Sequence, residues 1–177
     1  MKSKESAIER YIKLRELIDQ MAADLETINA GGMVCRKGCC DCCVNLTVFP
    51  VEFFAIVEGM KKAGVSKPAF DAARACGYLD EQGACVIYPF RPMICRTQGL
   101  PLAFYDDQQE GYSVSFCPKN FADDDPEDLD FGPDNTLNLD DLNDALFAIH
   151  LAYLAEHPES GYTEQTRIEL SRLGEYL

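Results

Sequence analysis

The chain contains the run Cys35-Arg36-Lys37-Gly38-Cys39-Cys40-Asp41-Cys42-Cys43, which holds five of its nine cysteines. The four others follow in the next stretch of sequence: Cys76, Cys85, Cys95 and Cys117. An ordinary hydrophobic core does not use thiols at this density. Their clustering therefore indicates disulfides, a metal or cluster site, or redox chemistry, and the rest of the sequence narrows these three explanations.

The surroundings of the cysteines favour reduced thiols. Residues 1–12 read MKSKESAIERYI, which is charged from the start and lacks the apolar core of a signal peptide. No apolar run reaches membrane-spanning length. We therefore expect a cytoplasmic protein, in which clustered cysteines more often bind metal or take part in catalysis than form disulfides. A secreted disulfide protein is the alternative, and the odd number of cysteines counts against it.

Composition predicts one globular domain, spanning residues 1–177, with neither nucleic acid nor membrane as a partner. A chain of 177 residues with 47% apolar content is large enough to bury its own core. Its formal net charge is −14 at pH 7, and ionised thiols would add to it. Nucleic acids and anionic membranes both attract basic surfaces. We interpret the negative charge mainly as a source of solubility.

The N-terminal part, residues 1–34, is predicted to be a helix over 4–29. Its apolar residues are spaced three and four apart and form one stripe: Tyr11, Leu14, Ile18, Met21, Leu25 and Ile28. Gly31 and Gly32 then end the helix. The stripe fits packing within its own domain. It also fits a seam with a protein partner or with a second copy of the chain.

The cysteine-rich part, residues 35–121, is predicted to contain little regular structure. Pro50 begins a predicted helix over 51–63, and a short helix is predicted over 69–75. Pro89 and Pro92 predict irregular, rigid backbone around Arg91. Such backbone suits the presentation of metal ligands.

The C-terminal part, residues 122–177, reads as an acidic loop over 122–138 followed by helices over 139–155 and 164–176. His150 lies in an apolar helical segment and is predicted to be a hydrogen-bonded core residue. The fold class we expect is therefore mainly α, with helices flanking an irregular, cysteine-rich metal-binding centre that contains little strand.

The cysteines have the chemistry of ligands for soft metals. Thiolates favour zinc, Cu(I) and iron–sulfur clusters, and four of them can close a zinc site or hold a cluster. Cys39 and Cys42 have the C-x2-C spacing that lets one turn of backbone offer two sulfurs to one ion. Several cations near the cysteines could offset thiolate charge and lower thiol pKa values: Arg36, Lys37, Arg74, Arg91, Arg96 and Lys119.

The run Cys35-x3-Cys39-x2-Cys42-Cys43 resembles the signature of the YkgJ-like cysteine-cluster family, whose domain is described as chelating zinc or iron. Further blocks resemble the family in the same order: Cys76-Gly77-Tyr78-Leu79, Gly83-Ala84-Cys85-Val86-Ile87-Tyr88, Arg91-Pro92-Met93-Ile94-Cys95-Arg96, Gly99-Leu100-Pro101 and Phe116-Cys117-Pro118-Lys119-Asn120-Phe121. The resemblance covers roughly residues 35–121. Two positions depart from it, since Gly77 stands where the family usually has proline and Cys40 occupies a variable position.

The resemblance implies eight metal ligands: Cys35, Cys39, Cys42, Cys43, Cys76, Cys85, Cys95 and Cys117. It also implies that Cys40 is an extra thiol. Eight thiolates could form two four-ligand sites, or one site with spare thiols. Adjacent Cys42 and Cys43 normally point in different directions, so they could serve different ions, or only one of them binds. We favour at least one all-cysteine site that draws on both the 35–43 run and the 76–117 segment.

Three classes of function fit these patterns. We favour a metal-binding protein that holds zinc, iron or an iron–sulfur cluster without catalysis of its own. A redox or radical enzyme is the first alternative, because the Cys35, Cys39 and Cys42 spacing equals the C-x3-C-x2-C spacing of radical SAM enzymes. Asp41 stands where those enzymes carry an aromatic residue, and the chain is short for their barrel. The second alternative is a structural zinc domain that serves interaction. Whether the chain is an enzyme stays open at this point.

Overall fold

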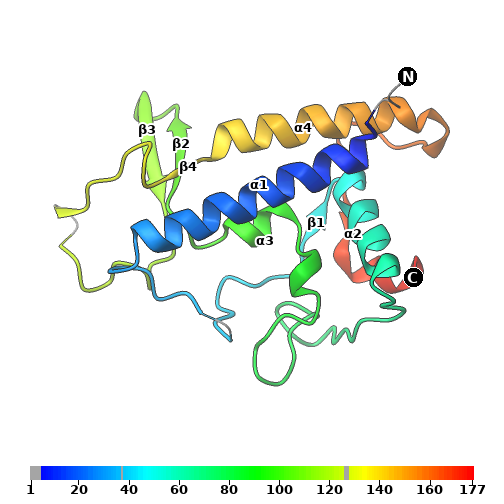
Figure 1. The fold of residues 1–177 in the computed structure, drawn as a ribbon, viewed down its shortest axis with the longest axis horizontal. Helices are drawn as coiled ribbons and strands as arrows, with labels where there is room; N and C mark the ends of the chain where they lie inside the picture. Colours follow the sequence, from blue (N-terminus) through cyan, green and yellow to red (C-terminus); the bar gives the residue numbers. More distant parts are fainter. Residues whose placement is uncertain (1–4, 37, 126–127) are drawn as a thin grey trace.

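The computed structural model describes residues 5–36, 38–125 and 128–177, and its fold is mainly α with two small sheets. Lys37 and the centre of the acidic loop, residues 126–127, lie outside the described residues. The helices are α1 (Ala7–Ile28), α2 (Pro50–Lys62), α3 (Met93–Thr97) and α4 (Leu139–Glu156), with shorter 3-10 helices η1 (Tyr88–Phe90), η3 (Pro158–Ser160) and η4 (Leu170–Glu175). Figure 1 shows α1 and α4 running side by side. The long loops of the cysteine-rich part lie on one side of this helix pair.

Helix α1 packs most of its apolar stripe into the core of its own chain, but the last stripe residue, Ile28, is 59% exposed. Ser6 caps the helix, because its hydroxyl accepts from the Glu9 amide at 3.2 Å and the Glu9 carboxylate accepts from the Ser6 amide at 2.8 Å. Residue 4, where the helix was predicted to begin, lies outside the described residues. Tyr11, Ile18 and Leu25 are buried in a cluster shared with α4 and α2. Pairing of α1 with a partner protein or a second copy stays a prediction.

A buried carboxylate joins α1, α2 and α3. Glu52 on α2 is 4% exposed and accepts a hydrogen bond from the Tyr11 hydroxyl at 3.0 Å. The Met93 amide, at the start of α3, donates to the same oxygen at 3.2 Å, and the Phe49 amide donates to the other oxygen at 3.3 Å. Burial raises the pKa of Glu52, and these three donors oppose that rise. The contact positions α3, which carries Cys95, against the two longer helices.

A second polar contact holds the proline-rich segment to α1. The Arg96 side chain is 5% exposed and pairs with Asp19 of α1. The same guanidinium donates to the carbonyls of Arg91 at 2.7 Å and Pro89 at 2.8 Å. Arg96, which the sequence suggested as a cation for thiolates, therefore supports the irregular backbone of residues 89–96.

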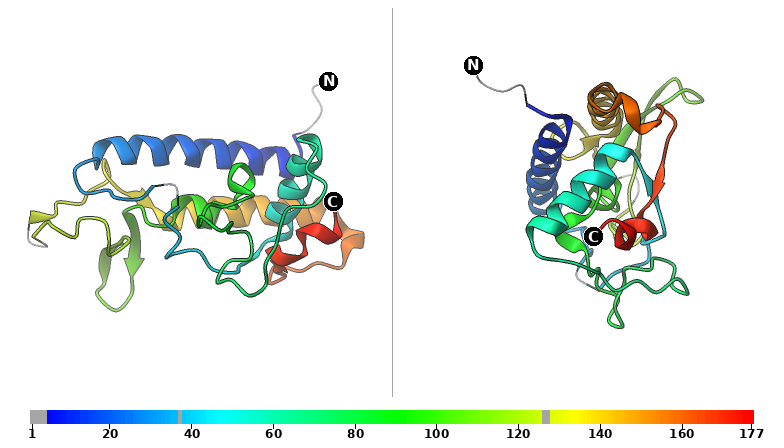
Figure 2. Two further views of the ribbon diagram at one scale, coloured as in Figure 1. Left: turned by 90° about the horizontal axis from the view of Figure 1, so that it is seen from below. Right: turned by 90° about the vertical axis from the view of Figure 1, so that its right-hand side faces the viewer.

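The strands form two small sheets. Strands β1 (Thr47–Val48) and β5 (Ile168–Glu169) pair antiparallel. Strand β2 (Leu102–Asp106) pairs antiparallel with β3 (Gly111–Ser115) and parallel with β4 (Leu137–Asn138). The β2–β3 hairpin projects from one end of the helical layer, as the two views of Figure 2 also show. From the sequence, little strand was predicted for this part of the chain, and this hairpin was not predicted.

Two predicted helices are wrong. Residues 69–75 form turns, because the Asp71 carboxylate accepts from the Ala73 amide at 3.0 Å and competes with helical hydrogen bonding. Residues 164–176 form β5 and the 3-10 helix η4, since Ile168 pairs with Val48 across the small sheet. The predicted helices over 51–63 and 139–155 are confirmed as α2 and α4.

Candidate metal centre

The five-cysteine run is a loop built from two tight turns. The Cys39 amide donates to the Arg36 carbonyl, and the Cys43 amide donates to the Cys40 carbonyl, both at 2.9 Å. Gly38 takes a φ of +91°, a conformation that residues with side chains rarely adopt. The turns therefore present Cys39 and Cys42 on short, bent backbone, as a C-x2-C metal ligand pair requires.

A first cysteine group is made of four thiols that interact electrostatically: Cys35, Cys39, Cys42 and Cys117. Burial raises the pKa of Cys35, and its three neighbours in the group raise it further because nearby thiolates repel one another. Burial raises the pKa of Cys42 as well, with Cys39 and Cys117 adding to that rise. Sequence positions 35 and 117 are thus brought together, as a shared site would require.

Asn120 and Gly99 hold the first cysteine group together. Asn120 is 1% exposed; its amide nitrogen donates to the Gly99 carbonyl at 2.8 Å and lies 3.5 Å from the Cys35 sulfur. Its amide oxygen accepts from the Val34 backbone at 3.0 Å. Gly99 has a φ of +93°, and a Cβ placed there would lie 3.2 Å from the Cys35 sulfur. Close packing at the sulfur therefore depends on glycine at this position.

An ion pair joins the five-cysteine run to the last cysteine. Lys119 pairs with Asp41, and its ammonium also interacts with the thiols of Cys39 and Cys117. The contact places a positive charge beside the first cysteine group, where it would offset the charge of bound thiolates.

The remaining family cysteines form a second cysteine group, made of Cys43, Cys76, Cys85 and Cys95. Burial raises the pKa of Cys43 to about 12, and the thiols of Cys42, Cys76 and Cys85 contribute to the rise. Burial also raises the pKa of Cys95 to about 12, and the neighbouring thiols add to this while Arg91 opposes it. Metal-free Cys43 and Cys95 are therefore protonated at neutral pH, so a metal that binds them displaces protons.

Hydrogen bonds from Asn45 bring the end of the run to the middle cysteines. The Asn45 amide donates to the Ala75 carbonyl at 2.8 Å, and its side-chain oxygen accepts from the Gly77 amide at 3.0 Å. These two contacts lie on either side of Cys76. Cys43, two residues before Asn45, is thereby held beside the second cysteine group.

Short backbone pairings position the other members of the second cysteine group. Cys85 forms an isolated antiparallel bridge with Leu79. Arg91 donates to the Cys95 carbonyl at 2.9 Å, and its guanidinium stacks on Tyr88 at 3.6 Å from the ring centre. Arg91 therefore holds the backbone at Cys95 and places a positive charge near the Cys95 thiol.

Cys40 lies beside the second cysteine group as a ninth thiol. Its thiol is among the neighbours that raise the pKa of Cys43, and a Cβ on Gly83 would lie 3.3 Å from its sulfur. Across residues 5–36, 38–125 and 128–177, no three Cys, His, Asp or Glu side chains are already arranged to hold a metal ion. The thiols lie in two groups, but their sulfurs are not yet placed as metal ligands. The coordination geometry would have to form when the ion binds.

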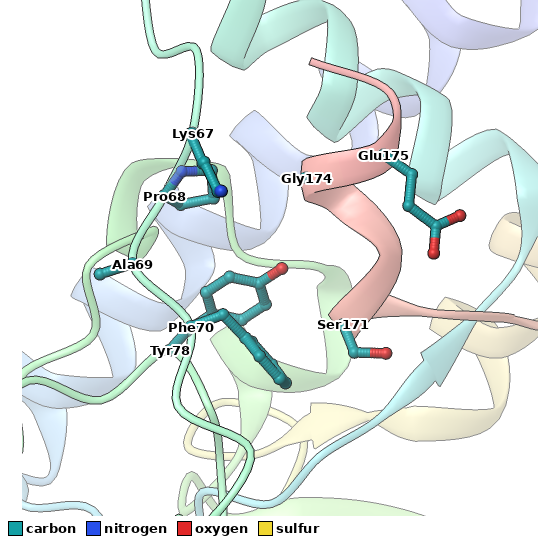
Figure 3. Close-up of a pocket in the computed structure, with 8 residues that line it drawn as sticks. All are labelled: Lys67, Pro68, Ala69, Phe70, Tyr78, Ser171, Gly174 and Glu175. Carbon is teal, nitrogen blue, oxygen red and sulfur yellow. The ribbon is translucent and has the colours of Figure 1, made fainter.

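Two cavities border the cysteine-rich part. One, of about 300 Å³, is lined by Cys42 and Cys117 of the first cysteine group together with Lys119. The other, of about 410 Å³, lies between residues 67–78 and η4. Figure 3 shows Phe70 and Tyr78 lying together across this second cavity from Ser171.

Phe70 covers Gly77, one of the two positions that depart from the family resemblance. Its ring meets the Tyr78 ring edge-on, with 4.9 Å between the ring centres. A Cβ added to Gly77 would lie 2.2 Å from the Phe70 ring, so the ring occupies the space that a side chain there would need. The Tyr78 hydroxyl donates to the Leu170 carbonyl at 2.7 Å and ties this segment to η4.

The two histidines lie on or beside α4. His150 is fully buried against Phe49, with 4.3 Å between ring centres, but neither of its ring nitrogens has a hydrogen-bond partner. Its predicted burial is confirmed. Burial lowers the pKa of His150, and backbone groups of Thr163 and Glu164 act on the ring and oppose that effect. The His157 ring contacts the Tyr153 carbonyl at 2.9 Å.

Sequence reasoning missed Asn120 and the role of Gly99. Asn120 lies within the last block of the family resemblance, which marked the segment but not the contact between its amide and the Cys35 sulfur. Gly99 lies two residues after the end of α3 and was part of the family resemblance, but only its left-handed backbone and its packing on the Cys35 sulfur show why glycine is needed.

Comparison with protein families matches residues 34–118 to the CxxCxxCC model, described as a "putative zinc- or iron-chelating domain". The matched range contains both cysteine groups. No curated protein and no solved structure matches the chain. Within the described part of the chain, the longest helices are too short or too polar to cross a bilayer.

Proposed function

Because residues 34–118 belong to the zinc- or iron-chelating cysteine-cluster family, we propose that the chain binds zinc, iron or an iron–sulfur cluster through cysteine thiolates alone. The proposed ligands are the eight members of the two cysteine groups. The proposed role is metal binding, as a chelator, carrier or electron-transfer module, without catalysis of its own.

One observation carries this proposal: cysteines far apart in sequence lie together in two neighbourhoods. Cys35 interacts with Cys117, and Cys43 interacts with Cys76 and Cys85. Sulfur donors of this kind suit soft or borderline metals. Lys119 and Arg91 lie beside the first and second cysteine groups respectively, where their charges would offset those of the bound thiolates.

The purified protein is expected to contain metal whose ligand shell is sulfur only. X-ray absorption should give metal–sulfur distances near 2.3 Å if the metal is zinc. Purification should be anaerobic, because zinc can replace iron when a cluster is lost in air. A shell dominated by nitrogen or oxygen would contradict the proposal.

The visible spectrum of the same sample separates the classes of function. A brown protein that bleaches with dithionite supports an iron–sulfur cluster, either in an electron-transfer module or in a redox enzyme. A colourless protein that contains zinc alone supports a chelating or structural domain. Metal analysis alongside the spectrum gives the number of ions per chain.

Cys40→Ser is expected to leave the metal content nearly unchanged, whereas Cys39→Ser should lower it. Serine is a much poorer ligand for soft metals, so only substitution of a ligand should reduce stoichiometry. The two positions are adjacent, which makes Cys40→Ser a matched control. If both variants lose the same amount of metal, the run binds through all its thiols and the assignment of Cys40 as an extra thiol is wrong.

A further inference from the structure

We propose that the eight cysteines form two separate four-thiolate sites divided between Cys42 and Cys43, and that the first exchanges its metal much faster than the second. The first cysteine group would be the exchanging site and the second cysteine group the retaining site. This inference rests on the proposed function, because it assigns the ligands and the kinetics of that same metal centre.

Different segments build the two groups. The first is held by Asn120 and Gly99, which join residues 34–35 to residues 117–120. The second is held by Asn45, which reaches residues 75–77, and by the bridge between Leu79 and Cys85. The two sets of contacts share no residue, so different parts of the chain hold the two groups.

The proposed boundary between the two sites lies between the adjacent residues Cys42 and Cys43. Cys42 lines the cavity of about 300 Å³ together with Cys117. Asn45, two residues after Cys43, hydrogen-bonds on either side of Cys76. The adjacent thiols of Cys42 and Cys43 also interact with each other. The tight turn closed by the Cys43 amide on the Cys40 carbonyl ends at Cys43, where the chain leaves the five-cysteine run toward β1. The five-cysteine run would therefore supply three ligands to one site and one ligand to the other.

Exposure differs between the groups. Cys35, Cys39 and Cys42 are exposed, and the cavity of about 300 Å³ opens beside Cys42 and Cys117. An incoming ligand can therefore reach a metal held by the first cysteine group. Lys119, at the same cavity, would attract anionic ligands.

The second cysteine group lies against apolar core. All four of its thiols are partly buried, and Cys76 and Cys85 pack on a cluster that includes Tyr78 and Ile87, each 2% exposed. A competing ligand would reach a metal there only after the surrounding segment opens locally. Release from this group should therefore be slower.

The test is the release of zinc to excess chelator, with the full-length chain loaded with Zn²⁺ under reducing conditions. We expect two bound zinc ions and two release phases of equal amplitude, with rates that differ by about tenfold or more. Native mass spectrometry counts the ions retained at each time. A single phase, or a single bound ion, would overturn the two-site inference.

Variants locate the division. Cys42→Ser and Cys117→Ser, far apart in sequence, should both remove the fast phase and one zinc ion while the slow phase keeps its rate. Cys43→Ser, the neighbour of Cys42, should remove the slow phase instead. Cys40→Ser serves as the matched control and should keep both phases. Equal losses in Cys42→Ser and Cys43→Ser would overturn the inference.

The outcomes also separate the two proposals. If Cys43→Ser fails to fold, Cys42→Ser and Cys117→Ser still test the division. Two separate sites predict that both variants keep the slow phase of zinc release. A single site that uses all these thiols predicts that both lose it. If the unmodified chain binds no zinc or iron through sulfur, the proposed function itself fails. If it binds one ion through sulfur, only the division into two sites fails.

Discussion

Chelating the bound metal is expected to expose the cysteine loops, residues 33–46 and 64–92, to hydrogen exchange while α1 and α4 stay protected. The loops are joined mainly by turns and isolated hydrogen bonds. By contrast, α1 and α4 bury Tyr11, Ile18 and Leu146 in a shared apolar cluster. Structural zinc can contribute on the order of 10 kcal/mol to the folding of small domains, so loss of metal should release the loops first.

Hydrogen exchange measured by mass spectrometry, with and without chelator, tests this result. Zinc added in excess over the chelator should restore protection in the loops and serves as the control. Loss of protection spread evenly over α1, α4 and the loops would show that the metal supports the whole fold, contrary to the prediction.

Replacing Glu52 by alanine is expected to lower the free energy of unfolding by about 3–5 kcal/mol. The substitution leaves three donors without an acceptor: the buried Tyr11 hydroxyl and Met93 amide, and the partly buried Phe49 amide. Urea unfolding of the two proteins at one pH measures the difference. Glu58→Ala is the control on the same helix, because Glu58 pairs with Lys62 at the surface and should change stability by about 0.5 kcal/mol or less.

Glu52 should also shape the dependence of stability on pH. Burial raises its pKa in the folded chain above the ordinary value of 4.5. A carboxyl group with a raised folded pKa stabilises the fold at low pH, and that contribution is lost as the pH rises from 4.5 through the folded value. Unfolding midpoints of Glu52→Gln over this range should fall less steeply with pH than those of the unmodified chain. An identical slope would mean that Glu52 keeps an ordinary pKa.

The helices that could be predicted are those whose local signals agree with their packing. The apolar stripe of α1, Pro50 at the start of α2 and the apolar run of α4 each mark elements that bury the expected faces. Residues 164–176 were also predicted to be a helix, but Ile168 pairs with Val48 and forms the short strand β5 instead. A contact between distant segments decided that structure, and local periodicity does not report it.

The β2–β3 hairpin lacked the usual sequence signals. Residues 102–105 are continuously apolar and do not alternate as a half-buried strand does. Its turn ends at Glu110, which takes a φ of +50°, although glycine or asparagine normally marks such positions. The signal was therefore weak in both the strand and the turn.

The family resemblance implied eight of the nine cysteines in the matched region as ligands, and that set stays a prediction. The family match supports a chelating domain there. Which thiols lie together depends on Asn120 reaching Gly99 and on Asn45 reaching Ala75. These contacts join segments far apart in the chain, so motif spacing alone left the alternatives open.

The ring of Phe70 over Gly77 has a consequence for how this sequence can drift over evolutionary time. A side chain at 77 and the phenyl ring at 70 compete for one volume, because a Cβ at 77 would lie 2.2 Å from the ring. Proline at 77, the residue usual in the family that the sequence resembles, would require the ring to move or a smaller residue at 70. The two sites should therefore change together among descendants of this chain, with large aromatic residues at 70 accompanying glycine at 77.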